Sequence, residues 1–344
     1  MALMAKPVTI RDVARRAAVS PGTVSRVMGG YPGVAEGTRR RVLEFVEALG
    51  YRPNPAAQRL SSGKSLTVAV TVPFFTLPSV SARLNGAINL LAGTAYDLIV
   101  HNIQVAEERP ACFQNIPHRR QADGLLIISI SPLCETEATS LERADIPIVM
   151  IDADHPALTG VPRVVVDDEE GGRLATEHLL RLGHRRIGFL GDRADNPFHM
   201  TSTRDRLRGH RQALQAAGVT MRAEDLLEAG HTRAEARCLA RRLLASADRP
   251  TAIFSASDTQ AAGVLEAARD LGLRVPAQLS LVGYDDIELA EIVGLTTVRQ
   301  PLFRSGQRGM QLLLDALRGH PSPPIREVLP LELVVRGTTG PAPA

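Results

Sequence analysis

Apolar residues recur with helical spacing through the first fifty positions of the chain. Those of residues 10–17 fall at i, i+3, i+4 and i+7, which predicts a helix whose N-cap is Thr9. A second predicted helix, residues 21–28, begins after Ser20, another N-cap residue. A third covers residues 36–50 and ends at a glycine. Two short helices joined by a tight turn are typical of a helix-turn-helix that enters the major groove of DNA.

From Ser65 onward, short apolar runs alternate with amphipathic stretches. The predicted strands are residues 66–72, 97–100, 124–129, 147–151, 164–166, 187–190, 252–255 and 279–283, with an alternating segment at 328–335. The predicted helices are residues 79–91, 171–182, 206–217, 234–246, 259–271 and 303–317. This alternation indicates βαβ units, and their number predicts an α/β core of two doubly wound parallel-sheet lobes. Ligands in such lobes bind outside the carboxyl ends of the strands.

Charge is distributed unevenly between these two regions. Residues 1–64 hold eleven Lys and Arg against four Asp and Glu, a net charge of +7. The remainder of the 344-residue chain carries a net charge of −4. A basic head on a mildly acidic body predicts that the head binds a polyanion and that the body has another task.

The cysteines and the hydropathy exclude several classes of protein. Cys112, Cys134 and Cys238 are widely spaced and odd in number, which gives no disulfide framework and no zinc-ligand spacing. This usage is typical of the reducing cytosol. The first residues do not resemble a secretion signal, and no apolar run reaches the length of a membrane span. We therefore expect a cytoplasmic protein with no membrane partner.

The sequence contains no arrangement typical of catalysis. The carboxylates at 167–170 stand at a predicted helix start, where the helix dipole accounts for them. His178 and His184 flank a helix end without a third metal ligand at suitable spacing. Neither a phosphate-binding glycine loop nor a nucleophile elbow occurs. We expect a protein that is not an enzyme and that uses no metal and no cofactor.

A series of motifs resembles the LacI/GalR family of bacterial transcription repressors. In order, the motifs are VTIRDVARRAAVSPGTVSRV, LGYRPNPAAQRL, VVVDDEEGGRLATEHLLRLGHRRIGFLGD, SASDTQAAGVLEAARDLGL, SLVGYDD and LTTVRQP. The resemblance implies an all-α helix-turn-helix head, a hinge helix and a two-lobed core like the periplasmic sugar-binding proteins. The implied boundaries are 1–52 for the head, 53–64 for the hinge, 65–165 with 299–323 for the N-terminal lobe, 166–298 with 324–338 for the C-terminal lobe, and 339–344 for a disordered tail.

The resemblance also assigns DNA contacts in the head. These fall at Thr9, Ser20, Pro21, Gly22, Thr23, Ser25, Arg26 and Arg39. Pro21 and Gly22 lead the recognition helix but cannot form a bidentate contact to a base, which makes Arg26 the best candidate for guanine. Ala18 stands where the family often has glycine. If that turn requires a left-handed conformation, alanine costs about 1–2 kcal/mol there; a relaxed turn is the alternative.

Four further DNA contacts are implied in the hinge, at Asn54, Ala57, Arg59 and Leu60. Leu60 matches the family's hinge leucine, an apolar wedge that would unstack base steps in the minor groove and bend the duplex. The alternative is a plain interdomain linker in which Leu60 only tethers the head to the core.

Effector contacts are implied in the core, at Phe74, Phe75, Asp152, Arg206, Ser257, Asp285 and Gln300. Carboxylates accept paired hydroxyls and arginine offers a fork of donors, so these side chains suit a sugar. Many sugar-binding members have asparagine where this chain has Ser257, which leaves sugar phosphates, nucleobases and amines open. Each polar residue could instead be a helix cap or a turn residue.

The resemblance therefore implies a transcription regulator, of the repressor kind, that binds a palindromic operator in double-stranded DNA as a homodimer. A small effector, expected to be a mono- or disaccharide, would bind between the lobes and change how the paired hinges meet the DNA. Whether the effector releases DNA or promotes binding stays open. The alternative is a sugar-binding solute receptor without a DNA function, which the basic head argues against.

Overall fold

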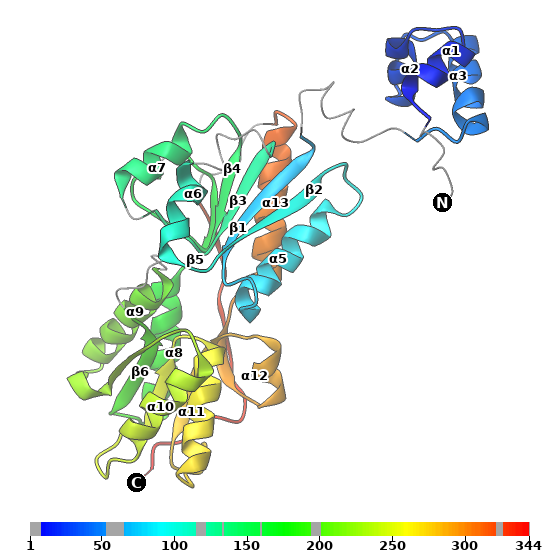
Figure 1. The fold of residues 1–344 in the computed structure, drawn as a ribbon. Coiled ribbons are helices and arrows are strands. Elements are labelled where there is room, and N and C mark those ends of the chain that lie inside the picture. Colours follow the sequence, from blue (N-terminus) through cyan, green and yellow to red (C-terminus); the bar gives the residue numbers. More distant parts are fainter. Residues whose placement is uncertain are drawn as a thin grey trace. The chain divides into compact units, whose positions relative to one another are not determined.

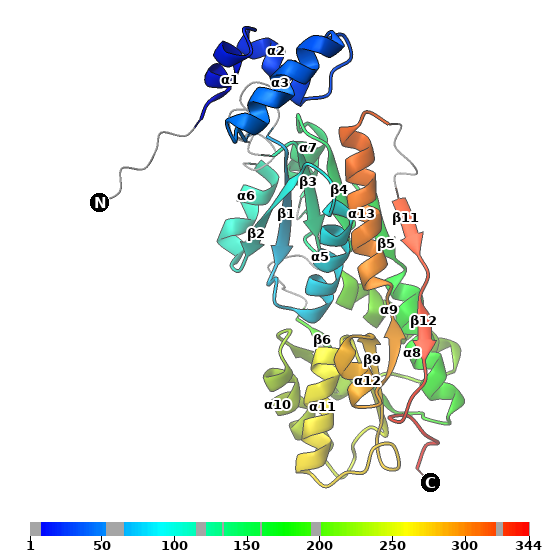
Figure 2. The same cartoon turned by 90° about the vertical axis from the view of Figure 1, so that its right-hand side faces the viewer.

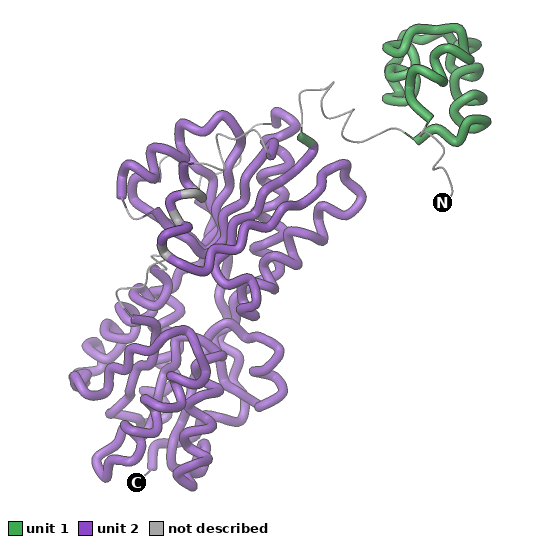
Figure 3. Tube along the Cα trace, in the orientation of Figure 1, with its two compact units in different colours: residues 1–65 green, residues 66–344 purple. Residues whose placement is uncertain are grey.

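The computed structural model describes residues 8–52, 65–114, 122–132, 134–158, 160–193, 201–320 and 326–343. The chain divides into two compact units, residues 1–65 and 66–344 (Figure 3). The predicted hinge, residues 53–64 with Asn54, Ala57, Arg59 and Leu60, lies outside the described residues. None of the described helices is both long and apolar enough to cross a lipid bilayer.

The first unit is a bundle of three helices, α1 (Ile10–Arg16), α2 (Pro21–Met28) and α3 (Glu36–Ala48) (Figure 1). Their apolar stripes share one small core, formed by Val13, Ala14, Ala17, Val24, Val27 and Val42. Both predicted N-caps are present. The Asp12 carboxylate accepts hydrogen bonds from the Thr9 amide (3.0 Å) and hydroxyl (2.7 Å), and the Ser20 hydroxyl accepts one from the Thr23 amide (3.2 Å). The predicted helix-turn-helix is confirmed.

The turn between α1 and α2 is strained at Ala18. Its φ is +52°, in the left-handed region that favours glycine. Of the two conformations that the sequence left open, the relaxed turn is therefore wrong. The methyl group costs about 1–2 kcal/mol in this conformation, which the packing of α1 against α2 has to offset.

The N-terminal lobe contains a six-stranded parallel sheet of order β11-β5-β4-β3-β1-β2. Its strands are β1 (Thr67–Pro73), β2 (Asp97–Ile103), β3 (Gly124–Ile128), β4 (Ile148–Ile151), β5 (Arg163–Val166) and β11 (Arg326–Leu329). Helices α5 (Pro78–Leu91) and α13 (Leu302–Leu317) pack on one face, and α6 (Arg109–Gln114) and α7 (Glu135–Glu142) on the other. Figure 2 shows α5 and α13 running along the sheet. A short 3₁₀ helix, η1 (Ala106–Glu108), precedes α6.

The C-terminal lobe repeats this plan with the order β12-β10-β9-β8-β6-β7, in which only β12 is antiparallel. Its strands are β6 (Ile187–Asp192), β7 (Leu226–Ala229), β8 (Ala252–Ser255), β9 (Ser280–Asp285), β10 (Thr296–Arg299) and β12 (Glu332–Val334). Its helices are α8 (Asp168–Arg181), α9 (Ser202–Ala216), α10 (Arg233–Leu244), α11 (Asp258–Asp270) and α12 (Glu288–Ile292), with the 3₁₀ helix η3 (Ala223–Asp225). Helices α8 and α9 cover one face, and α10 and α11 the other. The predicted pair of doubly wound lobes is confirmed.

The chain crosses between the lobes three times, after β5, after β10 and after β11. The third crossover differs from the prediction, which assigned residues 324–338 to the C-terminal lobe. Instead β11 pairs in parallel with β5, so the N-terminal lobe extends to Leu329. The alternating segment 328–335 is divided by Pro330, which cannot donate a hydrogen bond to a strand ladder. The single strand predicted at 328–335 is therefore divided between two strands. Its first residues belong to β11 in the N-terminal sheet, and its later residues form β12 in the C-terminal sheet.

The C-terminal tail is ordered through residue 343, and its predicted disorder is wrong for residues 339–343. The Ala342 amide donates to the Leu182 carbonyl (2.9 Å). The Gly340 carbonyl lies 3.1 Å from Nε2 of His184, a buried ring whose other nitrogen meets Thr251 (2.8 Å). A polar, proline-containing tail carries no hydrophobic pattern, so these anchoring hydrogen bonds could not be anticipated.

Candidate functional site

Residues with strained backbone conformations lie at the carboxyl ends of strands in both sheets. Phe74, Ser129 and Asp152 follow β1, β3 and β4 with φ of +43°, +56° and +55°, and Asp285 and Asp286 lie at the end of β9 with φ of +109° and +55°. All five stand at carboxyl ends of strands, where this fold class binds ligands. Such conformations cost about 1–3 kcal/mol each and persist where the surrounding structure fixes them, often at binding sites.

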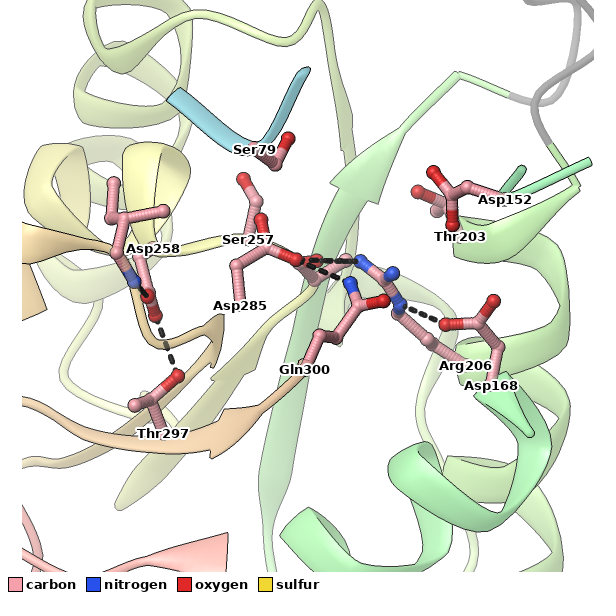
Figure 4. Close-up of polar contacts among 12 residues, drawn as sticks. Ser79, Asp152, Asp168, Thr203, Arg206, Ser257, Asp258, Asp285, Thr297 and Gln300 are labelled. Carbon is pink, nitrogen blue, oxygen red and sulfur yellow. Dashed lines mark hydrogen bonds and ion pairs between the residues drawn. The ribbon is translucent and has the colours of Figure 1, made fainter. Parts of the chain in front are cut away.

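Arg206 of α9 is the centre of the C-terminal lobe's wall (Figure 4). Its Nε donates to Oδ1 of Asp168 (2.7 Å) and its Nη1 donates to the Ala256 carbonyl (2.6 Å). Oδ1 of Asp285 lies 4.0 Å from Nη1, and the guanidinium stands 3.6 Å above the ring centre of Tyr284. A stacked, doubly hydrogen-bonded guanidinium is held in one orientation.

The electrostatics of this group follow from its burial. Burial alone would lower the pKa of Arg206, but the negative charges of Asp168 and Asp285 outweigh it, and the pKa is raised. Burial raises the pKa of Asp168 and of Asp285, and Arg206 opposes both shifts. The guanidinium therefore stays charged and favours the ionised form of each carboxylate against the effect of its burial.

Two glycines allow Arg206 and Tyr284 to sit against the start of α8. A Cβ on Gly172 would lie 2.0 Å from the Arg206 carbonyl oxygen, and a Cβ on Gly171 would lie 2.2 Å from the Tyr284 hydroxyl. Both approaches are shorter than any real Cβ contact. The DDEEGG stretch of the sequence thus provides a carboxylate for Arg206 and, directly after it, the space in which the arginine and tyrosine pack.

A second polar cluster surrounds Asp192 at the end of β6. Its carboxylate accepts from Nδ1 of His231 (3.0 Å), Nε2 of Gln260 (3.0 Å) and the Thr203 hydroxyl (3.3 Å). Burial would lower the pKa of His231, yet the charge and hydrogen bond of Asp192 raise it. The same pair lowers the pKa of Asp192 against the effect of its own burial. This cluster is a second ion pair on the C-terminal lobe's wall.

The N-terminal lobe contributes Asp152, which follows β4. Oδ1 of Asp152 forms an ion pair with Nη2 of Arg83 (2.9 Å), and its Oδ2 accepts from the Ser129 hydroxyl (2.6 Å). Gln300, on the second crossover, accepts from Arg83 (3.0 Å) and donates to Asp285 (2.6 Å). Asp152, Gln300 and Asp285 are thereby connected across the two lobes.

A pocket of about 200 Å³ opens between the lobes next to this network. The N-terminal lobe lines it with Asp152 and Asp154, and the C-terminal lobe with Asp168, Thr201 and Asp205. Its volume is below the roughly 300–1,000 Å³ typical of sites for drug-sized ligands. This pocket therefore suits a small polar molecule; of the four clustered residues expected at the effector site, Asp152 is the one that lines it.

Four of the residues expected at the effector site, Asp152, Arg206, Asp285 and Gln300, are brought together. Ser257 is different: it is buried, caps α11 by accepting from the Gln260 amide (3.2 Å), and donates to the Gln260 side chain (3.1 Å). For Ser257 the geometry is that of a helix cap. Phe74 is half-buried against the lobe's core, while Phe75 is 46% exposed. The backbone of Phe75 is held at both ends, since its amide donates to Asn102 (3.0 Å) and its carbonyl accepts from the Ser81 hydroxyl (2.8 Å).

The sequence did not single out Arg83, Ser129, Asp192, Thr203, His231, Gln260 or Tyr284 as site residues. The interpretation of the carboxylates at 167–170 as residues stabilised by the dipole of α8 is only partly correct. Asp167 does cap the helix, accepting from the Glu170 amide (2.9 Å), but Asp168 turns to Arg206. Asp192 is the last residue of β6 and Asp168 comes two residues after β5, and these positions at the carboxyl ends of strands were the available signal.

The head exposes a candidate DNA interface along α2. Pro21, Gly22, Ser25 and Arg26 are exposed. The Ser20 hydroxyl is engaged in capping α2, 3.0 Å from that of Thr23. Thr9 donates to Asp12, and Arg39 donates to the Tyr31 carbonyl (2.8 Å), which ties α3 to the loop that follows α2. Of the side chains expected on DNA, Arg26 and Ser25 are therefore the most free to reach bases.

Comparisons with known proteins agree with this architecture. The family model for bacterial regulatory proteins of the lacI family matches residues 9–54, and the periplasmic binding protein-like domain matches residues 176–339. Catabolite control protein A of Priestia megaterium is 33% identical over 89% of this chain and 91% of its own length. The chain belongs to the LacI family. It is also 34% identical to the HTH-type transcriptional repressor PurR of Vibrio vulnificus, over 96% of this chain and 98% of that protein.

Solved structures of LacI-family proteins share the fold. The lac repressor dimer bound to operator and the anti-inducer ONPF superposes with a TM-score of 0.82 at 30% identity, covering 97% of this chain and all of that one. The complex of the transcriptional regulator CelR with cellobiose gives a TM-score of 0.69 at 30% identity over 96% and 99% of the two chains. As a LacI-family member, the protein is a DNA-binding transcription regulator with an effector-binding core, and its relatives are regulators rather than enzymes.

Proposed function

We propose that this LacI-family protein is a repressor that binds a near-palindromic operator as a homodimer and is switched by a sugar in the interlobe cleft. The observation that carries the proposal is the meeting of Asp152, Arg206, Asp285 and Gln300 at the carboxyl ends of strands from both lobes. Carboxylates and guanidinium groups alternate there, and sugar hydroxyls both donate and accept. A ligand that touches both lobes can favour one arrangement of them over another.

Two structural relatives support a sugar as the effector. One is the CelR–cellobiose complex, and another is a LacI-family regulator from Enterococcus faecium with bound ribose. The pocket of about 200 Å³ between the lobes is lined by Asp152 and Asp168, whose carboxylates can accept from sugar hydroxyls. Because Ser257 is engaged in capping α11, the sugar contacts come from the other polar residues, with Phe75 exposed at the end of β1 for stacking on a sugar ring.

DNA binding is assigned to the basic head. Arg26 on α2 suits guanine in the major groove, while Thr9, Ser20, Thr23, Ser25 and Arg39 suit phosphates or a thymine methyl group. Pro21 and Gly22 offer shape rather than hydrogen bonds, so DNA deformability has to contribute to specificity. In the hinge, Asn54, Ala57 and Arg59 accompany Leu60, the proposed minor-groove wedge. The regulator acts in the cytoplasm, where bacterial DNA is.

The homodimer is proposed to form along one side of the core. The edge strand β2 exposes Ile99 (43%) and Val100 (40%), and α5 exposes Ile88 (43%). In the C-terminal lobe, Ile292 (73%) and Val293 (40%) stand on or beside α12, next to a groove that α11 also lines. An unpaired apolar edge strand is normally covered, and a second copy covers both surfaces at once. Two-fold symmetry of the dimer implies a near-palindromic operator.

The proposal is tested by two experiments on the full-length protein. A thermal-shift screen should contain monosaccharides and disaccharides together with sugar phosphates, nucleobases and amines. Selection from a random duplex library should then yield the operator, whose affinity is measured with and without each hit. We expect a sugar to raise the Tm and to change operator affinity about 5-fold or more. A hit that leaves operator affinity unchanged, or selected sites without two-fold symmetry, would contradict the proposal.

Arg206→Met provides the specificity control for the sugar. Removing the guanidinium should abolish the shift in Tm caused by the hit, because Arg206 is a site residue. Arg173→Met removes an arginine of α8 that pairs only within its own helix, with Glu170 and Glu177. That variant should respond to the sugar as the wild type does.

A further inference from the structure

Arg83 is a buried cation on α5 that pairs with Asp152, a residue of the cleft wall. Only 3% of its side chain is exposed. Its Nη2 lies 2.9 Å from Oδ1 of Asp152 and 3.0 Å from Oε1 of Gln300. Nη2 of Arg83 thus contacts both Asp152, at the end of β4, and Gln300, on the second crossover. Nη1 of Arg83 also donates to the Ser79 carbonyl of its own helix (3.4 Å). Since burying a guanidinium is costly unless it is paired, this placement depends on these partners, of which Asp152 and Gln300 lie outside α5.

The link continues into the C-terminal lobe. Gln300 uses its other amide atom, Nε2, to donate to Oδ1 of Asp285 (2.6 Å). The order Asp152–Arg83–Gln300–Asp285 therefore runs from the end of β4 in one sheet to the end of β9 in the other. We call these four residues the interlobe link. Any rotation that separates the two strand ends has to break one of its three contacts.

Helix α5 cannot absorb such a rotation by sliding along α13. A Cβ on Gly86 would lie 2.0 Å from the Phe303 carbonyl oxygen, and a Cβ on Gly306 would lie 1.8 Å from the carbonyl oxygen of Arg83 itself. The two helix backbones are therefore in direct contact at the turn that carries Arg83. Because α13 begins two residues after Gln300, the crossover and α5 move as one body.

One donor of Arg83 remains free within this link. Its Nε is buried and has no hydrogen-bond partner among the described residues. A buried donor without a partner in a native structure indicates that a ligand or water completes the site. An oxygen of a bound effector placed between the lobes would meet this N–H.

We propose that Arg83 is a positioning residue that holds the lobes of the effector-free protein in one arrangement through the interlobe link. The effector then joins a link that already exists, accepting from Nε of Arg83. The proposal rests on the proposed function only in treating the cleft as the effector site. The hold on the lobes is independent of what the cleft binds, so it can be tested without any ligand.

Two natural cysteines allow this test on the full chain. Cys134 stands at the start of α7 in the N-terminal lobe and Cys238 on α10 in the C-terminal lobe, and both are exposed. With Cys112→Ser as the background, spin labels at both positions report the interlobe distance by pulsed electron paramagnetic resonance. Labelled chains are diluted with unlabelled ones so that a homodimer carries one labelled copy.

The effector-free wild type should give one narrow distance distribution. Arg83→Met, which keeps the volume and removes all hydrogen bonds, should shift and broaden it. The control is Arg173→Met, which removes a partly exposed arginine whose partners Glu170 and Glu177 lie on its own helix α8. Its distribution should equal that of the wild type. A wild-type distribution in Arg83→Met would overturn the proposal.

Gln300→Met keeps the test valid if Arg83→Met does not fold. This variant cuts the same link at its next member and should broaden the distribution in the same way. The double variant should be no broader than the broader single variant, because residues of one link do not add. Independent, additive broadening would contradict a shared link. Sugar binding and operator affinity do not enter this result, so the failure of the proposed function would be seen separately.

Discussion

Both lobes have six strands in equivalent order and differ in the direction of one edge strand, but they present different walls to the cleft. The wall of the C-terminal lobe is a dense polar network, with Arg206 and Asp192 each held by three or more partners. The wall of the N-terminal lobe pairs Asp152 with Arg83, and Asp154 with Arg163 and Arg326. It adds one serine and two aromatic residues, of which Phe75 is nearly half exposed. One fold therefore supports a rigid surface and a more adaptable one.

This difference suggests a division of labour. Groups fixed before a ligand arrives recognise it without an ordering cost, which suits the C-terminal lobe for selecting the effector. A wall with fewer contacts can change its arrangement at low cost, which suits the N-terminal lobe for responding. The predictions below compare matched changes in the two walls.

The largest effect is expected from Arg206→Met. It leaves Asp168 and Asp285 buried without their cation, and breaking a buried pair in this way costs about 3–5 kcal/mol. Arg83→Met leaves only Asp152 without a cation, and Asp152 keeps its hydrogen bond from Ser129, so it should cost less. Urea denaturation of both variants measures the difference. Equal losses of stability would show that the two walls are equally rigid.

A pair of glycine substitutions compares packing in the same way. Gly171→Ala drives a methyl group to 2.2 Å from the hydroxyl of Tyr284, whose ring is fixed under Arg206. Gly309→Ala on α13 meets Cδ1 of Ile151 at 2.4 Å, the end of a side chain that can rotate. Overpacking costs typically about 1–3 kcal/mol, and we expect Gly171→Ala near the upper limit and Gly309→Ala near the lower one. Thermal unfolding followed by calorimetry measures both losses of stability. A larger loss for Gly309→Ala than for Gly171→Ala would contradict this prediction.

Ser129→Ala should have a smaller effect. It removes one hydrogen bond to Asp152, which Arg83 still neutralises, so the loss of stability should be about 1 kcal/mol. Effector affinity should fall more than stability, because Ser129 orients a carboxylate of the site. Chemical denaturation and calorimetric titration with the identified sugar separate the two effects. An unchanged affinity would mean that Asp152 is positioned by Arg83 alone.

The smallest effect is a pH dependence from His231. Its pKa in the folded protein lies above the ordinary 6.5, so its pairing with Asp192 stabilises the fold fully below pH 6.5. That contribution is lost as the pH rises through the raised pKa. The stability advantage of the wild type over His231→Gln should therefore shrink with increasing pH above 6.5. An advantage that is constant from pH 6 to pH 9 would show that the imidazole is neutral throughout.

Most of the fold could be predicted because its signals are local. The GLLII run is the buried strand β3, and the amphipathic stripe of residues 303–317 is α13. Helix α7 was missed, since ETEATSLE has almost no apolar periodicity: Ala138 and Leu141 are its buried apolar residues, and Glu137 is buried beside them. The third crossover was misplaced because one alternating pattern fits either sheet equally well.

The site could be predicted only in part. The family resemblance implies the positions of Asp152, Arg206, Asp285 and Gln300 at the site. It does not tell which residues each of them contacts. Arg83 carries no local signal, since an arginine on an amphipathic helix is usually exposed, and its burial depends on Asp152 and Gln300, which are distant in sequence. Such pairs become visible only once the strands are assembled.

The three crossovers have a consequence for how this chain is made. The sheet of the N-terminal lobe includes β11, and α13 covers one face of that sheet. The N-terminal lobe is therefore incomplete until residue 329 has been synthesised. The C-terminal lobe in turn waits for β12 and for the tail that binds Leu182. During translation the head can fold and leave the ribosome early, while both lobes remain incomplete until residues 329 and 342 have been added. Removal of residues 325–344 would therefore damage the effector-binding core while leaving the head intact.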